Sequence, residues 1–209
     1  MSTSWQRVAR AQEGPHYAEA YADRFRALEA AGHDVHGEAR FVHELLGRPA
    51  RILDAGCGTG RVGARLAALG HDVVGCDADA SMVRVARRDW PEVPWHVADL
   101  TSLDAARSGG NFDVALLAGN VVPLLAPGTL AQVGRNLRQV LEPAGLVVAG
   151  FGLDPAHLPP GCDPVPLRDV ETALGSAGLT LQQRWGGWDG ADLGGDSGYA
   201  VLVWRRDAT

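Results

Sequence analysis

Hydrophobic positions in the first part of the chain recur with helical spacing. One apolar stripe, at steps of four, four and three residues, consists of Tyr17, Tyr21, Phe25 and Leu28. A second stripe lies within 41–46, after the glycines at positions 32 and 37. Apolar residues three and four positions apart share one face of a helix, so residues 15–47 predict two helices.

From residue 51 onward, short apolar runs alternate with stretches of helical periodicity. The runs predict strands at 51–55, 73–76, 94–98, 112–118 and 146–151. The intervening pattern predicts helices at 61–69, 80–88, 130–141 and 167–177, with Asp79 capping the second and Thr129 the third. Uninterrupted apolar strands between helices are typical of parallel strands that are buried on both faces. We therefore expect an α/β three-layer sandwich.

The last two apolar runs, 179–185 and 199–205, have only a glycine-rich loop between them. Without a crossover helix they cannot be parallel neighbours, so they predict an antiparallel hairpin at one edge. The complete expectation is a mostly parallel seven-stranded sheet within one domain, since the chain has 209 residues.

Charge excludes several function classes. All 19 basic residues are Arg, which rules out a Schiff-base lysine and a P-loop lysine. The formal net charge is −6 and no basic block stands out, so we expect no nucleic-acid partner.

Cysteines and apolar runs indicate the compartment. The three Cys residues are an odd number without metal-ligand spacing, which favours a reducing cytoplasm and no metal site. Residues 1–7 lack the apolar core of a signal peptide. The longest apolar stretch, 114–126, is broken by Asn120 and Pro123 and is too short to span a bilayer, so we expect no membrane association.

Polar residues and glycines gather where the predicted strands end. Residues 54–60 follow the first strand, Asp77 the second, Asp99 the third, and Gly119 with Asn120 the fourth. Ligands of open parallel sheets bind beyond the carboxyl ends of the strands. We therefore expect these residues to line one site.

The loop after the first strand carries glycines at alternate positions, Gly56, Gly58 and Gly60. Glycine lets the backbone turn sharply and approach a ligand closely, and the next helix points its N-terminus at the same place. Asp77 lies 17 residues after Gly60 and can accept hydrogen bonds from both hydroxyls of a ribose. The spacing predicts a nucleoside-containing ligand.

Asp54 bears on which nucleoside binds. Residues 58–63 match the dinucleotide pattern G-x-G-x-x-G, which by itself is a weak signal. A fixed carboxylate would repel a pyrophosphate, whereas it would attract a ligand with a positively charged tail. An NAD(P)-dependent oxidoreductase stays an alternative, although the chain has no Lys for a Tyr-x-x-x-Lys pair.

Residues 52–60 (ILDAGCGTG) resemble motif I of the class I S-adenosylmethionine (SAM)-dependent methyltransferases. The segments 74–82, 97–100, 112–120 and 137–151 resemble, in order, the motifs that follow it in this family. The resemblance spans roughly residues 50 to 205, most of the chain. It implies a Rossmann-like fold, SAM as cofactor and methyl transfer as the activity.

The resemblance also implies roles for individual residues. Gly56, Cys57, Gly58 and Gly60, with Asp54, would surround the methionine part of the cofactor, and Asp77 would bind its ribose. Around the adenine it places Ala78, Met82, Asp99 and Leu100. Near the methyl group it places Gly119 and Asn120.

Departures from the family's sequence patterns narrow the class of acceptor molecule. The sequence has Ala118-Gly119-Asn120-Val121 where many amine and base methyltransferases have Asn/Asp-Pro-Pro-Tyr, and no Pro-Cys nucleophile follows. Short links leave no room for an inserted substrate domain. We therefore expect a small-molecule acceptor under a lid formed by residues 1–48, on a methyltransferase core of residues 49–209.

Several side chains are candidates for the lid and the acceptor wall. Tyr17 and Tyr21 could place hydroxyls over the cofactor. An aromatic wall could form from Trp185, Trp188 and Asp189, and a base could come from His16, His33 or His36. No catalytic residue is assigned and the oligomeric state is not readable. A non-catalytic SAM-binding protein stays a second alternative.

Overall fold

The computed structural model describes residues 14–105 and 109–207. The expectation for residues 1–7 lies outside the described residues. The helices are α2 (Tyr17–Ala30), α3 (Gly37–Leu46), α4 (Arg61–Ala68), α5 (Ala80–Asp89), α7 (Val121–Leu124), α8 (Leu130–Val140) and α9 (Leu167–Ser176). Short 3-10 turns are η1 (Gly14–His16), η2 (Leu100–Ser102) and η3 (Pro155–His157).

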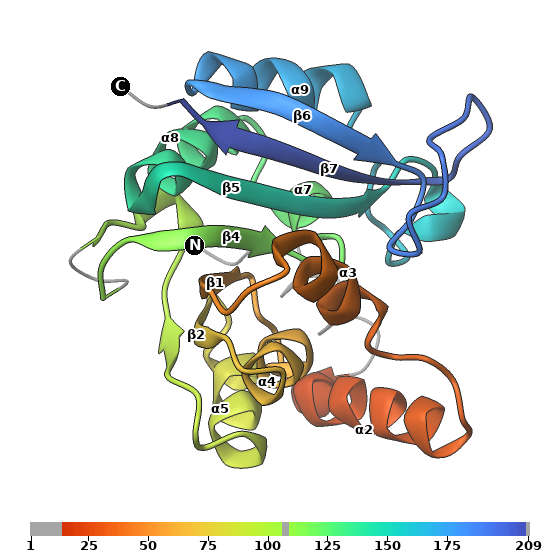
Figure 1. Cartoon of the computed structure of the whole chain (residues 1–209). Coiled ribbons are helices and arrows are strands. Elements are labelled where there is room, and N and C mark those ends of the chain that lie inside the picture. Colours follow the sequence, from red (N-terminus) through yellow and green to blue (C-terminus); the bar gives the residue numbers. More distant parts are fainter. Residues whose placement is uncertain (1–13, 106–108, 208–209) are drawn as a thin grey trace.

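The strands form a single seven-stranded sheet in the order β3-β2-β1-β4-β5-β7-β6 (Figure 1). They are β1 (Arg51–Ala55), β2 (Asp72–Asp77), β3 (Trp95–Val97), β4 (Phe112–Leu117), β5 (Leu141–Gly152), β6 (Leu179–Trp185) and β7 (Tyr199–Arg206). The first five run parallel, and β7 is antiparallel to both β5 and β6. The predicted sheet and its C-terminal hairpin are confirmed.

Alternating side chains of the central strands build two separate cores. Leu53 on β1 points into a cluster with residues of α7, α8 and α9, whereas Ile52 points into a cluster with residues of α3, α4 and α5. Successive strand residues face opposite sides of a sheet, so a strand that is apolar at both positions needs helices on both faces. The three-layer sandwich is confirmed.

Two details of helix α8 and of the strand that follows it differ from the expectation. The Thr129 hydroxyl donates to Ala126 O at 2.6 Å and makes no cap hydrogen bond to α8, because its backbone is already helical at φ −94° and ψ −9°. The next strand, β5, begins at Leu141, directly after α8, and not at 146. An irregular segment at 142–145, with Ala144 at φ 63°, interrupts its pairing with β4.

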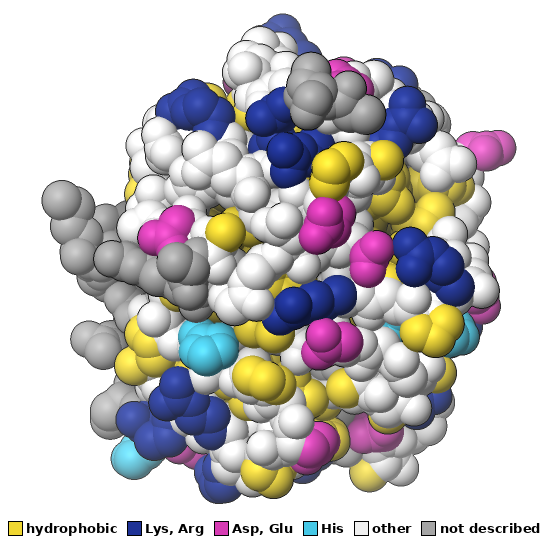
Figure 2. Space-filling model, turned by 60° about the vertical axis from the view of Figure 1, so that its left-hand side comes forward, with side chains coloured by type: hydrophobic (Ala, Val, Ile, Leu, Met, Phe, Trp, Pro, Cys, Tyr) yellow, Lys and Arg dark blue, Asp and Glu magenta, His cyan; other side chains and the backbone are white. Residues whose placement is uncertain are grey.

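The surface carries mixed charge. In the view of Figure 2, basic side chains gather near the top and at the lower left, and others lie singly beside acidic ones. Among the described residues, no helix is long and apolar enough to cross a membrane.

Candidate active site

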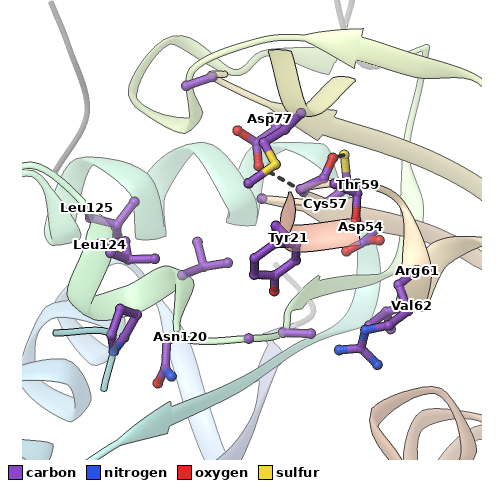
Figure 3. Close-up of a pocket in the computed structure, with 18 of the residues that line it drawn as sticks. Tyr21, Asp54, Cys57, Thr59, Arg61, Val62, Asp77, Asn120, Leu124 and Leu125 are labelled. Carbon is purple, nitrogen blue, oxygen red and sulfur yellow. Dashed lines mark hydrogen bonds between the residues drawn. The ribbon is translucent and has the colours of Figure 1, made fainter. Parts of the chain in front are cut away.

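The predicted strand ends border a cavity of about 940 Å³ (Figure 3). Most of the candidate residues line it: Asp54, Gly56, Cys57, Gly58, Asp77, Ala78, Met82, Asp99, Leu100, Gly119, Asn120 and Tyr21. The structure therefore brings together residues from four strand ends and from α2. Tyr17 and Gly60 are not among the lining residues.

Glycine is required at different positions of the loop after β1 for different reasons. Gly56, Gly58 and Gly60 all have positive φ, at 87°, 53° and 82°, where other residues are strained. A Cβ at Gly58 would meet open space, which suits a ligand lying against this backbone. A Cβ at Gly60 would sit 2.9 Å from the Trp95 ring, so this glycine serves packing beneath the loop.

Asp54 is buried at the end of β1, with 2% of its surface exposed. Its Oδ2 accepts from the backbone N–H of Gly63 at 3.0 Å, so the carboxylate holds the start of α4 while lining the cavity. Burial raises its pKa to about 7, and the Gly63 N–H and the nearby Arg61 oppose that rise. A positively charged ligand would favour the ionised form.

Asp77 ends β2 with each carboxylate oxygen holding one backbone donor. Its Oδ2 accepts from Gly58 N at 2.9 Å and its Oδ1 from Asp79 N at 2.8 Å. A carboxylate has about four lone-pair sites, so two remain for the hydroxyls of a diol. Burial raises the pKa of Asp77 to about 6, because the two backbone donors compensate only part of the lost hydration.

Asp99 both caps a turn and lines the cavity. Its Oδ1 accepts from the N–H and the hydroxyl of Thr101, each at 2.8 Å, which starts the η2 turn. The carbonyl of Leu100 is already used, because it accepts from the Asn136 amide at 2.8 Å.

The two tyrosines of α2 have different positions. Tyr17 is 1% exposed, and its hydroxyl donates to Asp79 and bonds to Ser81. It packs beside Met82, so it attaches α2 to α5, and it is not among the residues that line the cavity. Tyr21, one turn later, lines the cavity, and burial raises the pKa of its hydroxyl (Figure 3).

Asn120 joins the ends of β4 and β5. It has φ 69°, its Oδ1 accepts from Gly152 N at 2.6 Å, and its Nδ2 donates to His157 O at 3.0 Å. The amide therefore fixes the chain after β5 against the cavity. In Figure 3, Asn120 lies with Leu124 on the side of the pocket away from Asp54.

The aromatic candidates divide in a similar way. Trp188 lines the cavity and donates from Nε1 to the Tyr199 hydroxyl at 3.2 Å. Trp185 packs edge-on against Phe41, with ring centroids 5.0 Å apart. Asp189 accepts from Ala191 N within its own loop and does not line the cavity.

None of the three candidate histidines of the lid lines the cavity. His16 precedes α2, His33 lies in the exposed turn after it, and His36 bonds to Glu29 at 3.0 Å. The histidine that lines the cavity is His157, in a segment that gave no signal in the sequence beyond its Pro and Gly content.

A salt bridge at the cavity was also missed. Arg61 pairs through both guanidinium nitrogens with Glu38, at 2.6 and 3.0 Å, and each side chain is only 15% exposed. The guanidinium also lies 4.4 Å from the centroid of the Phe25 ring. These contacts join α2 and α3 to the start of α4. Residues of opposite charge 23 positions apart give no local pattern from which to predict this pair.

This arrangement fits an adenosine with a positively charged tail. Asp77 offers acceptors to a ribose, the open backbone at Gly58 admits a ligand, and buried Asp54 favours a cation. A diphosphate beside two buried carboxylates would be repelled. Within the described ranges, no group of three or more His, Cys, Asp or Glu side chains could hold a metal ion.

Comparisons with known proteins agree with this geometry. A family model described as a methyltransferase domain matches residues 52–145. A TehB-like SAM-dependent methyltransferase from Corynebacterium glutamicum is 35% identical, with a TM-score of 0.82, and the match covers 92% of this chain and 100% of that one. The chain therefore belongs to the SAM-dependent methyltransferases. This membership excludes the NAD(P)-dependent oxidoreductase, and SAM is the cofactor.

Two curated relatives act on different acceptors. A ubiquinone biosynthesis O-methyltransferase from Mesorhizobium japonicum is 31% identical over 65% of this chain and 62% of its own length. A dTDP-4-amino-2,3,4,6-tetradeoxy-D-glucose N,N-dimethyltransferase from Saccharopolyspora spinosa is 33% identical over 63% of this chain and 54% of its own length. The chain thus spans less than two thirds of each of these relatives.

Proposed function

We propose that this protein transfers the methyl group of SAM to a small-molecule acceptor. The observation that carries the proposal is the two-ended cavity. Asp54 and Asp77 line it beside the glycine loop, and Leu124 and Leu125 lie on the side away from Asp54 (Figure 3), while the apolar Leu158 also lines the cavity. Such a cavity holds a polar, charged cofactor and an apolar partner side by side.

At the polar end, the chain's own residues would hold the cofactor. Asp77 accepts from the ribose hydroxyls, Asp99 accepts from the adenine amino group, and Met82 packs on the ring. Asp54 lies toward the positively charged methionine part. Bound SAM supplies a methyl group already activated by a sulfonium, so the protein has mainly to align the acceptor and exclude water.

The lid proposal rests on α2 and α3. Tyr21 and Glu38 line the cavity from these helices, and the Glu38–Arg61 salt bridge attaches α3 to the core. On this basis we propose that the described helices within residues 1–48 form the lid and that residues 49–209 form the core. Closure over the cavity would exclude water from the transfer.

The net charge and the free thiols support a small-molecule partner and a cytoplasmic location. A net charge of −6 favours a small molecule over a nucleic acid. The names of the curated relatives, an O- and an N,N-dimethyltransferase, support a small acceptor. Cys57, Cys76 and Cys162 are free thiols, which supports a place in the cytoplasm.

The test measures binding first and turnover second. Thermal unfolding with SAM, S-adenosylhomocysteine or NADH at about 100 times a typical Kd should show stabilisation of ~2.7 kcal/mol for the first two and none for NADH. Formation of S-adenosylhomocysteine with a metabolite library then identifies an enzyme. Binding without turnover of any metabolite would instead favour the non-catalytic SAM-binding protein, and absence of binding would refute the proposal.

A further inference from the structure

A histidine and a carboxylate meet at the end of the cavity away from Asp77. The Nδ1 atom of His157 lies 2.8 Å from Oδ1 of Asp154, and His157 lines the cavity. Both side chains are about half exposed, at 49% and 45%. The hydrogen bond to the His157 ring is the first cause of a pKa of Asp154 below its ordinary value, so this carboxyl is ionised at neutral pH.

The protonation pattern of the ring follows from its partner. An ionised carboxylate can only accept hydrogen bonds, so Nδ1 of His157 carries the proton that lies toward Asp154. In a neutral ring, Nε2 then has a free lone pair. Among the described residues, no group bonds to Nε2.

The surrounding backbone is shaped to hold this pair. A Cβ at Gly198 would lie 2.2 Å from Cε1 of the His157 ring and 2.6 Å from Oδ2 of Asp154. A Cβ at Gly152 would lie 2.5 Å from the carbonyl oxygen of His157, which is the same oxygen that accepts from Asn120. Two glycines thus provide the space, and the Asn120 amide fixes the backbone.

The topology places the pair at the acceptor. Under the proposed function the nucleoside would lie over β2 and β3 and the methionine part over the loop after β1, which would leave the ends of β4 and β5 for the acceptor. His157 follows β5, and the wall there contains Leu158, Trp188 and Tyr199. This wall is apolar and aromatic, and it suits a flat aromatic ring.

We propose that His157, oriented by Asp154, is the general base for methylation of an aromatic hydroxyl. This inference rests on the proposed function and adds the acceptor class and the base. An aromatic hydroxyl has a pKa of about 10, so it is neutral at pH 7 and must lose its proton during transfer. An imidazole with a free Nε2 is suited to accept that proton.

The acceptor oxygen forms a bond to the methyl carbon, and the bond between that carbon and sulfur breaks with its electron pair left on sulfur. The hydroxyl proton moves to Nε2 of His157, which becomes an imidazolium stabilised by Asp154. The imidazolium then releases the proton to water. Around the ring, Asn120 contributes a neutral amide and Gly198 no side chain, and Asp154 is the charged group in contact among the described residues.

The first test reads the ring directly and needs no acceptor. Nitrogen-15 NMR of the protein with S-adenosylhomocysteine, with the His157 signals assigned by His157→Gln, should show Nδ1 protonated and Nε2 unprotonated in the neutral ring. In Asp154→Asn the tautomer population should shift. A ring protonated on Nε2, or one unaffected by Asp154→Asn, would overturn the arrangement.

The second test separates proton removal from positioning. At about pH 8, 4-nitrophenol is ionised and 4-methylphenol is neutral. His157→Ala should lower the methylation rate of 4-methylphenol by roughly 10²- to 10⁴-fold and should change that of 4-nitrophenol less than about tenfold. Asp154→Asn should show the same selectivity for the neutral phenol. Asp154 Oδ1 also accepts from the backbone N–H groups of Ala156 and His157, at 2.9 and 3.2 Å, and so caps the η3 turn. Equal loss on both phenols would leave Asp154 with this capping role alone and refute the base.

The matched control is His96→Ala, which removes an exposed histidine on β3 that does not line the cavity. It should leave both rates unchanged. Calorimetric titration with SAM separates the two hypotheses, since a wild type that does not bind SAM refutes the proposed function itself. A wild type that binds SAM but methylates neither phenol, or only thiols or amines, refutes the aromatic hydroxyl alone.

Discussion

Replacing Asp77 by Asn tests the cofactor site most directly. The substitution keeps the shape of the side chain but removes its charge and turns one acceptor oxygen into a donor. Both oxygens now face backbone N–H groups of Gly58 and Asp79. An amide therefore accepts from only one of them, and its NH₂ group faces the other donor.

The magnitude for binding comes from the hydrogen bonds that a ribose would make. Hydrogen bonds to a charged group contribute roughly 1.5–3 kcal/mol, so the Kd for SAM should rise about 10- to 150-fold. The stability of the unliganded protein should change little. A pKa raised from 3.8 to about 6, with the two backbone hydrogen bonds already included, means that the fold disfavours the charge by on the order of 3 kcal/mol. Removing this net cost offsets the unfavourable contact between the new NH₂ group and a backbone donor.

Calorimetric titration with SAM and with S-adenosylhomocysteine measures the effect, and thermal unfolding without ligand checks the fold. Asp72→Asn is the matched control, because Asp72 begins the same strand and is 68% exposed beside Arg51. It should bind SAM like the wild type. A Kd for Asp77→Asn within twofold of the wild type, with the fold intact, would refute the ribose assignment.

Three further predictions concern the charge of Asp54, the salt bridge that attaches the lid, and the wall that contains Trp188. Because a cation prefers an ionised carboxylate and the pKa of Asp54 is raised to about 7, affinity for SAM should weaken as the pH falls below about 7, by up to tenfold per unit; titration at several pH values checks this, and a flat profile contradicts it. Glu38→Gln leaves the largely buried Arg61 without its charged partner and should cost about 1–3 kcal/mol of unfolding free energy in urea, whereas an unchanged midpoint would show that the pair is not stabilising. Gly150→Ala places a Cβ 2.2 Å from the Trp188 ring, so it should raise KM for the acceptor more than Kd for SAM, and equal effects on both would argue against an acceptor wall.

The sheet could be predicted because the apolar pattern within each strand indicates which of its faces are buried. In β1, Ile52 and Leu53 are both apolar although they face opposite sides, and only a strand covered by helices on both faces needs this. The strand-end residues Asp54 and Asp77 could be predicted as site residues for a related reason. Parallel strands bring their carboxyl ends to the same edge, so order along the chain determines proximity in space.

Other parts of the site depend on contacts that no local pattern reveals. Nothing near Glu38 indicates that it meets Arg61, because this contact is set by how α3 packs on α4. Tyr17 and Tyr21 share one helical stripe, yet the first packs against α5 and the second reaches the cavity, since one turn of helix separates the two surroundings. Local spacing identifies a face of a helix but not what each position on it meets.

The histidine shows the same limit. His157 lies in a loop whose Pro and Gly content predicts irregular backbone and no particular direction. Its position depends on Asn120, on Gly152 and on Gly198, which belong to three separate segments. Such a site is defined only when all of them are in place.

The cavity wall combines Tyr21, from near the start of the described chain, with Tyr199, from its last strand. A nascent polypeptide therefore cannot assemble this wall until β7 has emerged from the ribosome and paired with β5. A cofactor bound in this cavity should protect both of these segments, which lie far apart in the sequence, from proteases at the same time. Resistance to digestion would then rise and fall with the cellular supply of SAM.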